Sequence, residues 1–131
     1  MVDYYPHLLS VSVADFFDGW RTAPGQDRFE AALRGSYAVE IAVADARVVG
    51  FVNAISDGVA TAFIPWLEVT RPYRGRGIGS ELMRRMLNRL STVYSVDLVC
   101  DPDLVPFYER LGMTRLDGMG LRFPARLSQR S

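Results

Sequence analysis

Apolar residues repeat at helical spacing over residues 13–22 and 78–90, which predicts a helix in each stretch, and a further helix is predicted over residues 26–34. In the first stretch Phe16, Phe17 and Trp20 share one face and are expected to anchor the helix to the core. The pattern over residues 78–90 is regular, because apolar side chains recur along one face: Ile78, Leu82, Met86 and Leu90. The first helix would end at Pro24-Gly25 and the second at Gly35, since proline and glycine interrupt helices.

Stretches rich in β-branched and aromatic residues predict strands around these helices. The predicted strands cover residues 7–12, 37–43, 47–56, 59–70 and 95–100, with a final pair around 113–123. Asp57-Gly58 has the composition of a hairpin turn, and a tight Ala-Asp-Ala turn joins the two strands before it. The pattern therefore predicts an α/β fold in which about four helices flank a mixed, mostly antiparallel sheet.

A further short helix is predicted around Tyr108. Asp103 is suited to its N-cap, Pro106 falls in a first turn that needs no intrahelical N–H bond, and Gly112 is suited to end it. This helix would place the adjacent aromatic residues Phe107 and Tyr108 directly after the predicted strand 95–100.

Residues 71–79 (RPYRGRGIG) lie between a predicted strand and the start of helix 78–90. Glycines at positions 75, 77 and 79 let the backbone approach a ligand closely and adopt positive φ angles. The helix start presents unpaired N–H groups and the positive end of its dipole. Arg74 and Arg76 add charges that bind phosphate oxygens. The segment therefore predicts a site for a phosphorylated ligand.

Two common phosphate-binding motifs do not match this segment. A Walker loop requires lysine after its last glycine, and the chain contains no lysine. A dinucleotide-binding fingerprint requires the spacing Gly-x-Gly-x-x-Gly with an acidic residue about 20 positions later. Here Gly79 follows Gly77 too closely, and residues 88–94 contain no carboxylate.

The spacing that does match is Arg74-x-x-Gly77-x-Gly79, which resembles the coenzyme A pyrophosphate loop of the GNAT family of N-acetyltransferases. The flanking residues 67–75 look like the strand that leads into that loop. A second segment, 106–113 (PFYERLGM), is similar to the short helix with an aromatic pair that recurs in this family. The resemblance covers residues 36–123 and implies one acetyltransferase domain over residues 1–131. It also implies that the central strands splay apart after Val69, at the cofactor site.

The resemblance implies that acetyl-CoA is the co-substrate. The residues expected to bind it are Leu67, Val69, Arg74, Gly75, Arg76, Gly77, Ile78, Gly79, Ser80, Asp101 and Phe107. Asp101 departs from the family pattern, which often has asparagine there to contact the pantetheine arm. Ionised aspartate accepts hydrogen bonds but does not donate them, so one contact would be lost or remade. Leu104 stands where the family commonly has a small residue.

The resemblance assigns Tyr108 the role of general acid, which protonates the leaving thiolate. A tyrosine with its ordinary pKa of about 10 keeps its proton at neutral pH and can donate it. The alternative is that Tyr108 only packs its helix against the sheet. Backbone N–H groups around residues 67–69 would stabilise the oxyanion.

The base that removes a proton from the amine is less clearly marked. Glu68 is one candidate, since it lies on the strand expected to line the acetyl group. It could equally bind the amine or lie on the surface, and water relayed through backbone carbonyls is a competing base. His7 is expected on the surface, and Cys100 is expected to be a small core residue at a strand end.

Charge and composition narrow the functional classes. Acids dominate residues 1–70 and arginines dominate residues 71–131, but the net charge is +0. A nucleic-acid-binding domain usually carries strong positive charge, so this class is not expected. The chain shows no apolar run of membrane-spanning length, no secretory signal and no Cys/His cluster. A cytoplasmic protein without a metal site or membrane partner is expected.

These observations predict an N-acetyltransferase that moves an acetyl group from acetyl-CoA to a primary amine by direct attack. The acceptor is not specified: a peptide or protein lysine, an N-terminal amine, a polyamine, an aminoglycoside and an arylalkylamine all stay open. The competing hypothesis is a non-catalytic acyl-CoA-binding sensor, which would not need a working Tyr108. The family also allows a homodimer, but the sequence marks no interface.

Overall fold

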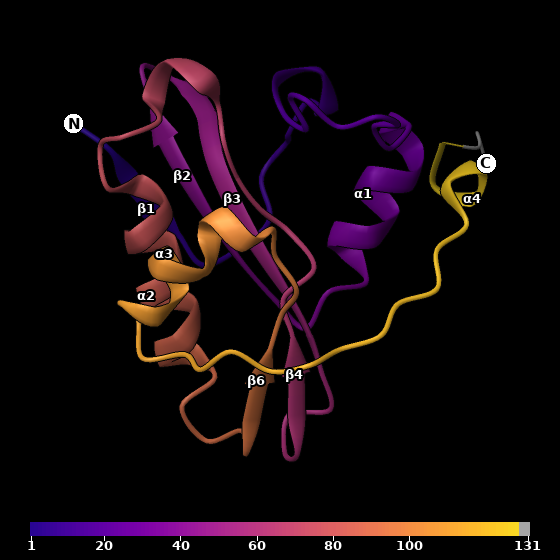
Figure 1. Cartoon of the computed structure of the whole chain (residues 1–131). Helices are drawn as coiled ribbons and strands as arrows, with labels where there is room; N and C mark the ends of the chain where they lie inside the picture. The colour runs from indigo at the N-terminus through magenta and orange to yellow at the C-terminus, as the bar shows by residue number, and fades with distance from the viewer. Residues whose placement is uncertain (129–131) are drawn as a thin grey trace.

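The computed structural model describes residues 1–128, and its centre is a six-stranded sheet (Figure 1). Its strands are β1 (Asp3–Tyr5), β2 (Ala38–Ala44), β3 (Arg47–Ser56), β4 (Thr61–Phe63), β5 (Leu67–Val69) and β6 (Ser95–Asp97). The strand order is β1-β2-β3-β4-β6, and β5 pairs with a different part of β3. Among the described strands only β4 and β6 pair in parallel, which confirms the predicted mixed, mostly antiparallel sheet.

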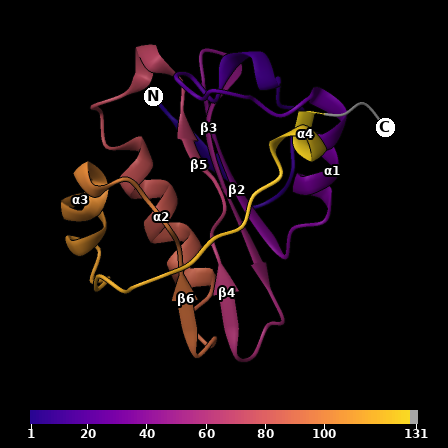
Figure 2. The same ribbon diagram turned by 45° about the vertical axis from the view of Figure 1, so that its right-hand side comes forward.

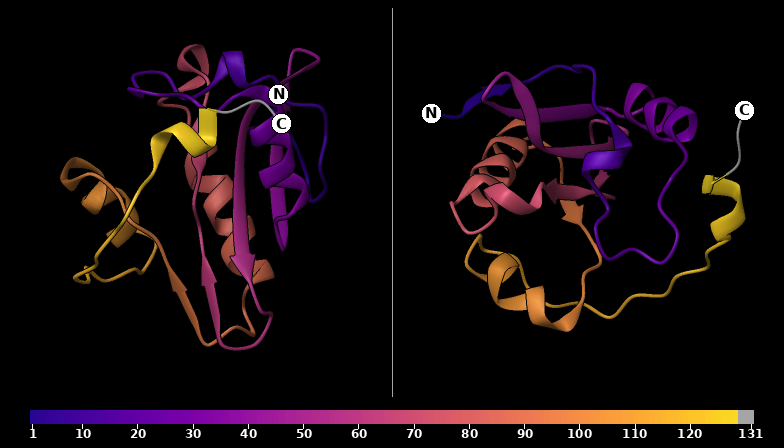
Figure 3. Two further views of the ribbon diagram at one scale, coloured as in Figure 1. Left: turned by 90° about the vertical axis from the view of Figure 1, so that its right-hand side faces the viewer. Right: turned by 90° about the horizontal axis from the view of Figure 1, so that it is seen from above.

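Helices lie on both faces of this sheet. They are α1 (Gln26–Arg34), α2 (Ile78–Arg89), α3 (Val105–Glu109) and α4 (Pro124–Ser128), with 3-10 turns η1 (Val13–Asp15), η2 (Arg71–Tyr73) and η3 (Pro102–Leu104). α1 covers one face and α2 the other, and α3 lies beside α2 (Figures 1 and 3). The structure confirms the helices predicted at 26–34 and 78–90, and about four helices in all.

The face of the sheet under α1 is packed with aromatic rings. Phe29 of α1 meets Phe51 of β3 with their ring centroids 5.4 Å apart. Phe17 and Trp66 join the same buried cluster, with their centroids 5.2 Å apart. Edge-to-face rings of this kind each add about 0.5–1.5 kcal/mol beyond the burial of their area. This cluster fastens the segment before α1 to the strands that lead to β5.

The face under α2 is aliphatic. Ala42 and Val52 of the sheet pack with Leu82, Met83 and Met86 of α2, and all five side chains are fully buried. The periodic apolar face read from the sequence is therefore the face that α2 buries. This packing holds the start of α2 next to β5.

The predicted strand 59–70 is interrupted and forms β4 and β5. Pro65 lies between them, and its nitrogen has no hydrogen for a sheet bond. Buried Asn53 spans the interruption: its backbone N–H donates to the Trp66 carbonyl, and its side-chain Oδ1 accepts from the Trp66 N–H, each at 3.2 Å. β6 pairs with β4 only, so β5 and β6 separate as the prediction of splayed strands requires.

The N-terminal predictions were wrong. Residues 7–12 form no strand, and β1 lies earlier in the chain. The helix predicted over 13–22 is reduced to η1, because Phe17 and Gly19 adopt φ angles of 62° and 81° that no α-helix contains. Phe17 is buried as expected, but Trp20 is exposed.

The C-terminal predictions also need correction. The predicted strand 95–100 ends at Asp97, where β6 leaves β4, and Cys100 is exposed instead of buried in the core. The strand pair predicted around 113–123 is not formed. That segment crosses the molecule as an exposed chain and leads into α4 (Figure 2).

Gly50 of β3 lies directly under α2, and this position predicts a measurable cost for a side chain. A Cβ atom there would lie 3.1 Å from Leu82 Cδ1 and 3.2 Å from the Glu68 carbonyl oxygen. We expect Gly50→Ala to lower the free energy of unfolding by about 1–3 kcal/mol, because overpacking a close-packed core strains it. Urea unfolding measures this change.

Gly118→Ala is the matched control for Gly50→Ala. A Cβ atom at this position would meet only Val99 Cγ1, at an ordinary 3.9 Å. Its expected effect is within about 0.5 kcal/mol of zero. Equal stability of the Gly50→Ala variant and the wild type would show that α2 can move away from β3 without cost.

Candidate active site

The turn between β5 and α2 has the backbone geometry that the glycine spacing predicts. Gly75 and Gly77 adopt φ angles of 76° and 84°, which are strained for any residue with a Cβ atom. Gly77 is the N-cap of α2. No other heavy atom lies within 4 Å of where a Cβ of either glycine would be, so both positions face open space. The turn is therefore accessible to a ligand.

The start of α2 supplies hydrogen-bond donors to this open space. The first bond within the helix runs from the Glu81 N–H to the Gly77 carbonyl at 3.0 Å. The N–H groups of residues 78–80 precede that bond and have no helical partner. Together with the helix dipole they favour an anion at this end of α2.

A cavity of about 410 Å³ connects this turn with α3. Its lining residues are Leu67, Val69, Tyr73, Arg74, Gly75, Gly77, Ile78, Gly79, Ser80, Leu104, Phe107 and Tyr108. Most of the residues predicted to bind the ligand are thus brought together around one hollow. Arg76, Glu68 and Asp101 do not line it, while Tyr73 and Leu104 do and were not predicted to bind.

Tyr73 lines the cavity and also ties the turn to another loop. Its hydroxyl donates to the Asp45 carboxylate in the β2–β3 turn, and the Arg76 guanidinium lies 5.0 Å from its ring centroid. The hydrogen bond to Asp45 is the main reason that the pKa of Tyr73 is raised. Only its position inside the RPYRG segment pointed to this residue, because Asp45 is distant in the sequence.

Arg74 is held at the edge of the cavity by two partners. Its Nε donates to the Val69 carbonyl at 3.0 Å, and its Nη1 lies 3.5 Å from Asp18 Oδ2. Asp18 also accepts from Arg71, and this hydrogen bond lowers the pKa of Asp18. A guanidinium placed in this way needs little reorganisation to meet a phosphate at the turn.

The hydrogen bonds between β5 and β3 show which edge of β5 is open. The Thr70 N–H donates to the Val49 carbonyl of β3 at 2.8 Å. N–H groups alternate in direction along a strand, so those of Val69 and Leu67 point away from β3, toward the gap left by β6. Two backbone donors are therefore directed to the open edge of β5.

Tyr108 closes the other end of the cavity. Its ring packs edge-to-face against Phe107, with the centroids 4.9 Å apart. Burial raises the pKa of Tyr108 to about 12, and the neighbouring Cys100 and Glu68 add to the effect. Its hydroxyl makes no hydrogen bond within residues 1–128. Tyr108 is thus a protonated donor at neutral pH whose proton is not already shared.

Glu68 lies on the opposite face of β5 from Leu67 and Val69, as strand alternation predicts. It is half-buried, and its Oε1 accepts the Phe17 N–H at 3.0 Å. Burial raises the pKa of Glu68, while the hydrogen bond from Phe17 and the charge of Arg74 oppose the rise. Glu68 is therefore not a fully exposed surface residue, and its carboxylate lies near Tyr108 without lining the cavity.

The remaining predicted residues lie at the margin. Asp101 is the exposed residue before η3, at the N-cap position, and makes no side-chain cap bond there. Cys100 precedes it and is close enough to affect Tyr108. His7 is exposed and packs beside Tyr5, as expected of a surface histidine.

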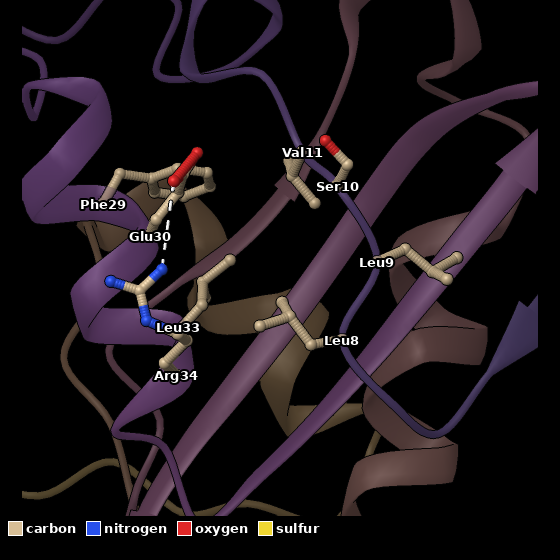
Figure 4. A pocket seen from close by; sticks show the side chains of 8 residues that line it. All are labelled: Leu8, Leu9, Ser10, Val11, Phe29, Glu30, Leu33 and Arg34. Atoms are coloured by element: carbon tan, nitrogen blue, oxygen red, sulfur yellow. Dashed lines mark ion pairs between the residues drawn. The ribbon is translucent and has the colours of Figure 1, made fainter.

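A second hollow of about 340 Å³ lies between the N-terminal segment and α1 (Figure 4). Its lining includes Leu8, Leu9, Val11 and Leu33, and a Glu30–Arg34 ion pair of 3.9 Å lies at its side. It has neither a glycine turn nor a set of free helix N–H groups. Of these two hollows within residues 1–128, the cavity at α2 is the one with the features expected of a phosphate site.

Two classes of site have no support in the described part of the chain. No group of His, Cys, Asp and Glu side chains within residues 1–128 could hold a metal ion. In the same residues, no helix is both long and apolar enough to cross a membrane.

Comparison with known proteins agrees with this geometry. The family model described as "Acetyltransferase (GNAT) family" matches residues 5–113. A crystal structure assigned as an acetyltransferase from Deinococcus radiodurans R1 is 41% identical, with a TM-score of 0.89 over 99% of this chain and 94% of that one. A GNAT family acetyltransferase from Streptococcus pneumoniae is 25% identical, with a TM-score of 0.75 over 94% and 97%.

Curated relatives match a shorter region. The uncharacterized N-acetyltransferase ycf52 of Porphyra purpurea is 33% identical over 72 residues, which cover 53% of this chain and 41% of that protein. The match thus spans about two fifths of the length of this relative. The family model, in contrast, covers most of the chain and includes both motifs. The chain therefore belongs to the GNAT family of acetyltransferases.

Proposed function

We propose that residues 1–131 form one N-acetyltransferase domain that moves an acetyl group from acetyl-CoA to a primary amine. The observation that carries this proposal is the single cavity that joins the glycine turn after β5 to Tyr108. One end of it suits an anion and the other presents a protonated hydroxyl. Acyl transfer from a phosphorylated thioester needs both functions in one connected space.

The residues present fit the phosphate groups of coenzyme A. Arg74 and the N–H groups at the start of α2 would hold the pyrophosphate, because they form a positive cradle beside two glycines that face open space. Phe107 and Leu104 would line the path of the pantetheine arm, with Asp101 at its margin. When bound, the thioester supplies an activated acetyl group.

Groups of the protein itself would then stabilise the developing charge and carry out the proton transfers. The N–H groups of Leu67 and Val69 would stabilise negative charge on the acetyl oxygen. As the amine nitrogen bonds to the acetyl carbon and the C–S bond breaks, Tyr108 would donate its proton to the sulfur. Before the attack, the ammonium group would give one proton to Glu68, either directly or through water. The second proton that the nitrogen loses on forming the amide would return to the Tyr108 oxygen.

Glu68 also indicates the side from which the acceptor arrives. The cavity lies on the Leu67 and Val69 face of β5, whereas Glu68 faces Phe17 and the α1 side. An amine that approaches from the α1 side would meet a carboxylate before it meets the acetyl group. We therefore propose a cationic amine as the acceptor. We also propose that the protein acts in the cytoplasm, without a nucleic-acid or membrane partner.

Tyr108→Phe tests the general acid. We expect kcat to fall about 10²-fold, which is the usual contribution of a general acid, while affinity for acetyl-CoA is retained. A thiol-release assay against a panel of amines measures kcat, and calorimetry measures binding. Tyr94→Phe is the matched control, because Tyr94 is almost fully exposed.

The same experiment separates the enzyme from a non-catalytic sensor. Binding of acetyl-CoA by the wild type without thiol release from any amine would favour the sensor. If the wild type is active and kcat is unchanged in Tyr108→Phe, Tyr108 is not the general acid, but the protein is still an enzyme.

The pH dependence of kcat/KM tests Glu68. A base must be deprotonated to act, so activity should rise with pH through the pKa of Glu68, which burial raises. Glu68→Gln should abolish this acid limb. Asp18→Asn should move it to lower pH, because the charge of Asp18 contributes to the raised pKa. Glu109→Gln, an exposed carboxylate on α3, should leave the limb in place.

If the rise of kcat/KM with pH is the same in Glu68→Gln and in the wild type, the base that accepts the amine proton is water or another group. At high pH, Tyr108 should not limit activity until its pKa of about 12 is approached.

A further inference from the structure

Trp20 belongs to the group of aromatic rings on the α1 face of the sheet, but the core does not bury it. The other rings of this group are at most 9% exposed: Phe16, Phe17, Phe29, Phe51 and Trp66. Trp20, in contrast, is 45% exposed. Its ring still has a fixed place, because it packs edge-to-face on Phe17 with the centroids 4.8 Å apart. The exposed part of the indole is therefore supported by the buried aromatic cluster.

The backbone around Trp20 folds its side chain back over Phe17. Gly19 adopts a φ angle of 81°, and the Trp20 N–H donates to the Phe17 carbonyl at 3.0 Å. Phe17 has a φ angle of 62°, which is strained for a residue with a Cβ atom and persists only where the surroundings hold it. Two left-handed residues within three positions thus form a tight turn that keeps the indole at the surface instead of in the core.

Phe17 also connects this indole to the candidate base. Its N–H donates to Glu68 Oε1 at 3.0 Å, and its ring contacts both Trp20 and Trp66. Trp66 and Glu68 are two positions apart in the chain that forms β5, so their side chains leave it on the same face. The Trp20 ring and the Glu68 carboxylate therefore both touch one residue, Phe17, on the α1 side of β5.

The carboxylate beside this indole is available to a cation. Within residues 1–128, Glu68 forms no ion pair and accepts one backbone N–H, at Oε1. Asp18 has Arg71 and Arg74 as its partners, so its charge is already matched. A primary ammonium group forms a charge-assisted hydrogen bond with a carboxylate, and an aromatic ring packs well on an indole. This surface therefore offers one group for the charge of an amine and another for a ring attached to it.

We propose that Trp20 determines acceptor specificity, and that the preferred acceptor is a small primary amine joined to an aromatic ring by a short alkyl chain. This inference rests on the proposed function, because it names the part of the acceptor next to the reacting amine. The ammonium group would pair with Glu68 while the ring packs on the exposed face of Trp20. A small aliphatic amine would make the first contact but not the second.

Phenethylamine and ethylamine, which differ by the ring, test the proposal in a thiol-release assay. We expect kcat/KM of the wild type to be about 10-fold higher for phenethylamine, because the ring is buried and makes an aromatic contact. Trp20→Ala should bring the ratio of the two values close to 1 by raising KM for phenethylamine. Trp20→Phe should retain part of the ratio, since it keeps a ring. Tyr94→Ala is the control, because Tyr94 is a 90% exposed aromatic residue just before β6.

Tryptophan fluorescence tests the same contact without turnover. The chain has two tryptophans, and Trp66 is buried, so a change of solvent contact at the surface reports on Trp20. With coenzyme A bound, phenethylamine should shift the emission to shorter wavelength, because its ring displaces water from the indole. Ethylamine should cause no such shift, and phenethylamine should cause none in Trp20→Phe.

Equal kcat/KM for the two amines in the wild type would overturn the proposal, and so would the same ratio in Trp20→Ala and the wild type. Thiol release from neither amine would count against the proposed function, whereas absence of the emission shift would overturn the role of Trp20. If circular dichroism shows that Trp20→Ala does not fold, Trp20→Leu, which keeps an apolar side chain without a ring, decides the outcome.

Discussion

The segment that pairs with β3 is interrupted at Pro65, because the proline nitrogen carries no hydrogen for a sheet bond. β3 holds β4 through Ile55 and Ser56 and holds β5 through residues 50–52. Asn53 spans the interruption with two hydrogen bonds, so the sheet continues although the strand does not. Because β6 follows β4, β5 keeps an open edge. The cavity, the free N–H groups of β5 and the start of α2 all meet there.

β5 also separates the two sides of the proposed reaction. Leu67 and Val69 line the cavity that suits the acetyl donor, while Glu68 faces the segment before α1. Phe17 connects these sides, because its buried ring belongs to the aromatic cluster and its N–H binds Glu68. The left-handed backbone of Phe17 is costly for a phenylalanine, and the aromatic packing around it offsets that cost. Strand alternation thus places the donor site and the candidate base within one short strand.

Local patterns predicted the parts of the structure that depend on neighbours in sequence. The apolar period of α2 and the glycines of its preceding turn are examples, since helix faces and positive φ angles are properties of short segments. The predictions failed where contacts with residues distant in the sequence determine the local conformation. The spacing of Phe16, Phe17 and Trp20 is helical, yet Phe17 is held by Glu68, 51 positions away. Tyr73 was missed as a lining residue for the same reason, because its partner Asp45 comes from another turn.

The sequence by itself determined the family, the α/β class and the position of the phosphate-binding turn, because these rest on residue types at fixed spacing. Only the tertiary structure decided how these pieces meet. It set Tyr108 at the far end of the cavity from the turn, placed Glu68 half-buried on the other face of β5, and left residues 114–123 without a partner strand. Each of these depends on pairing and burial between distant segments. The strand-like pattern at 113–123 indicates that these residues can form a strand, but they do so only where a partner strand is available.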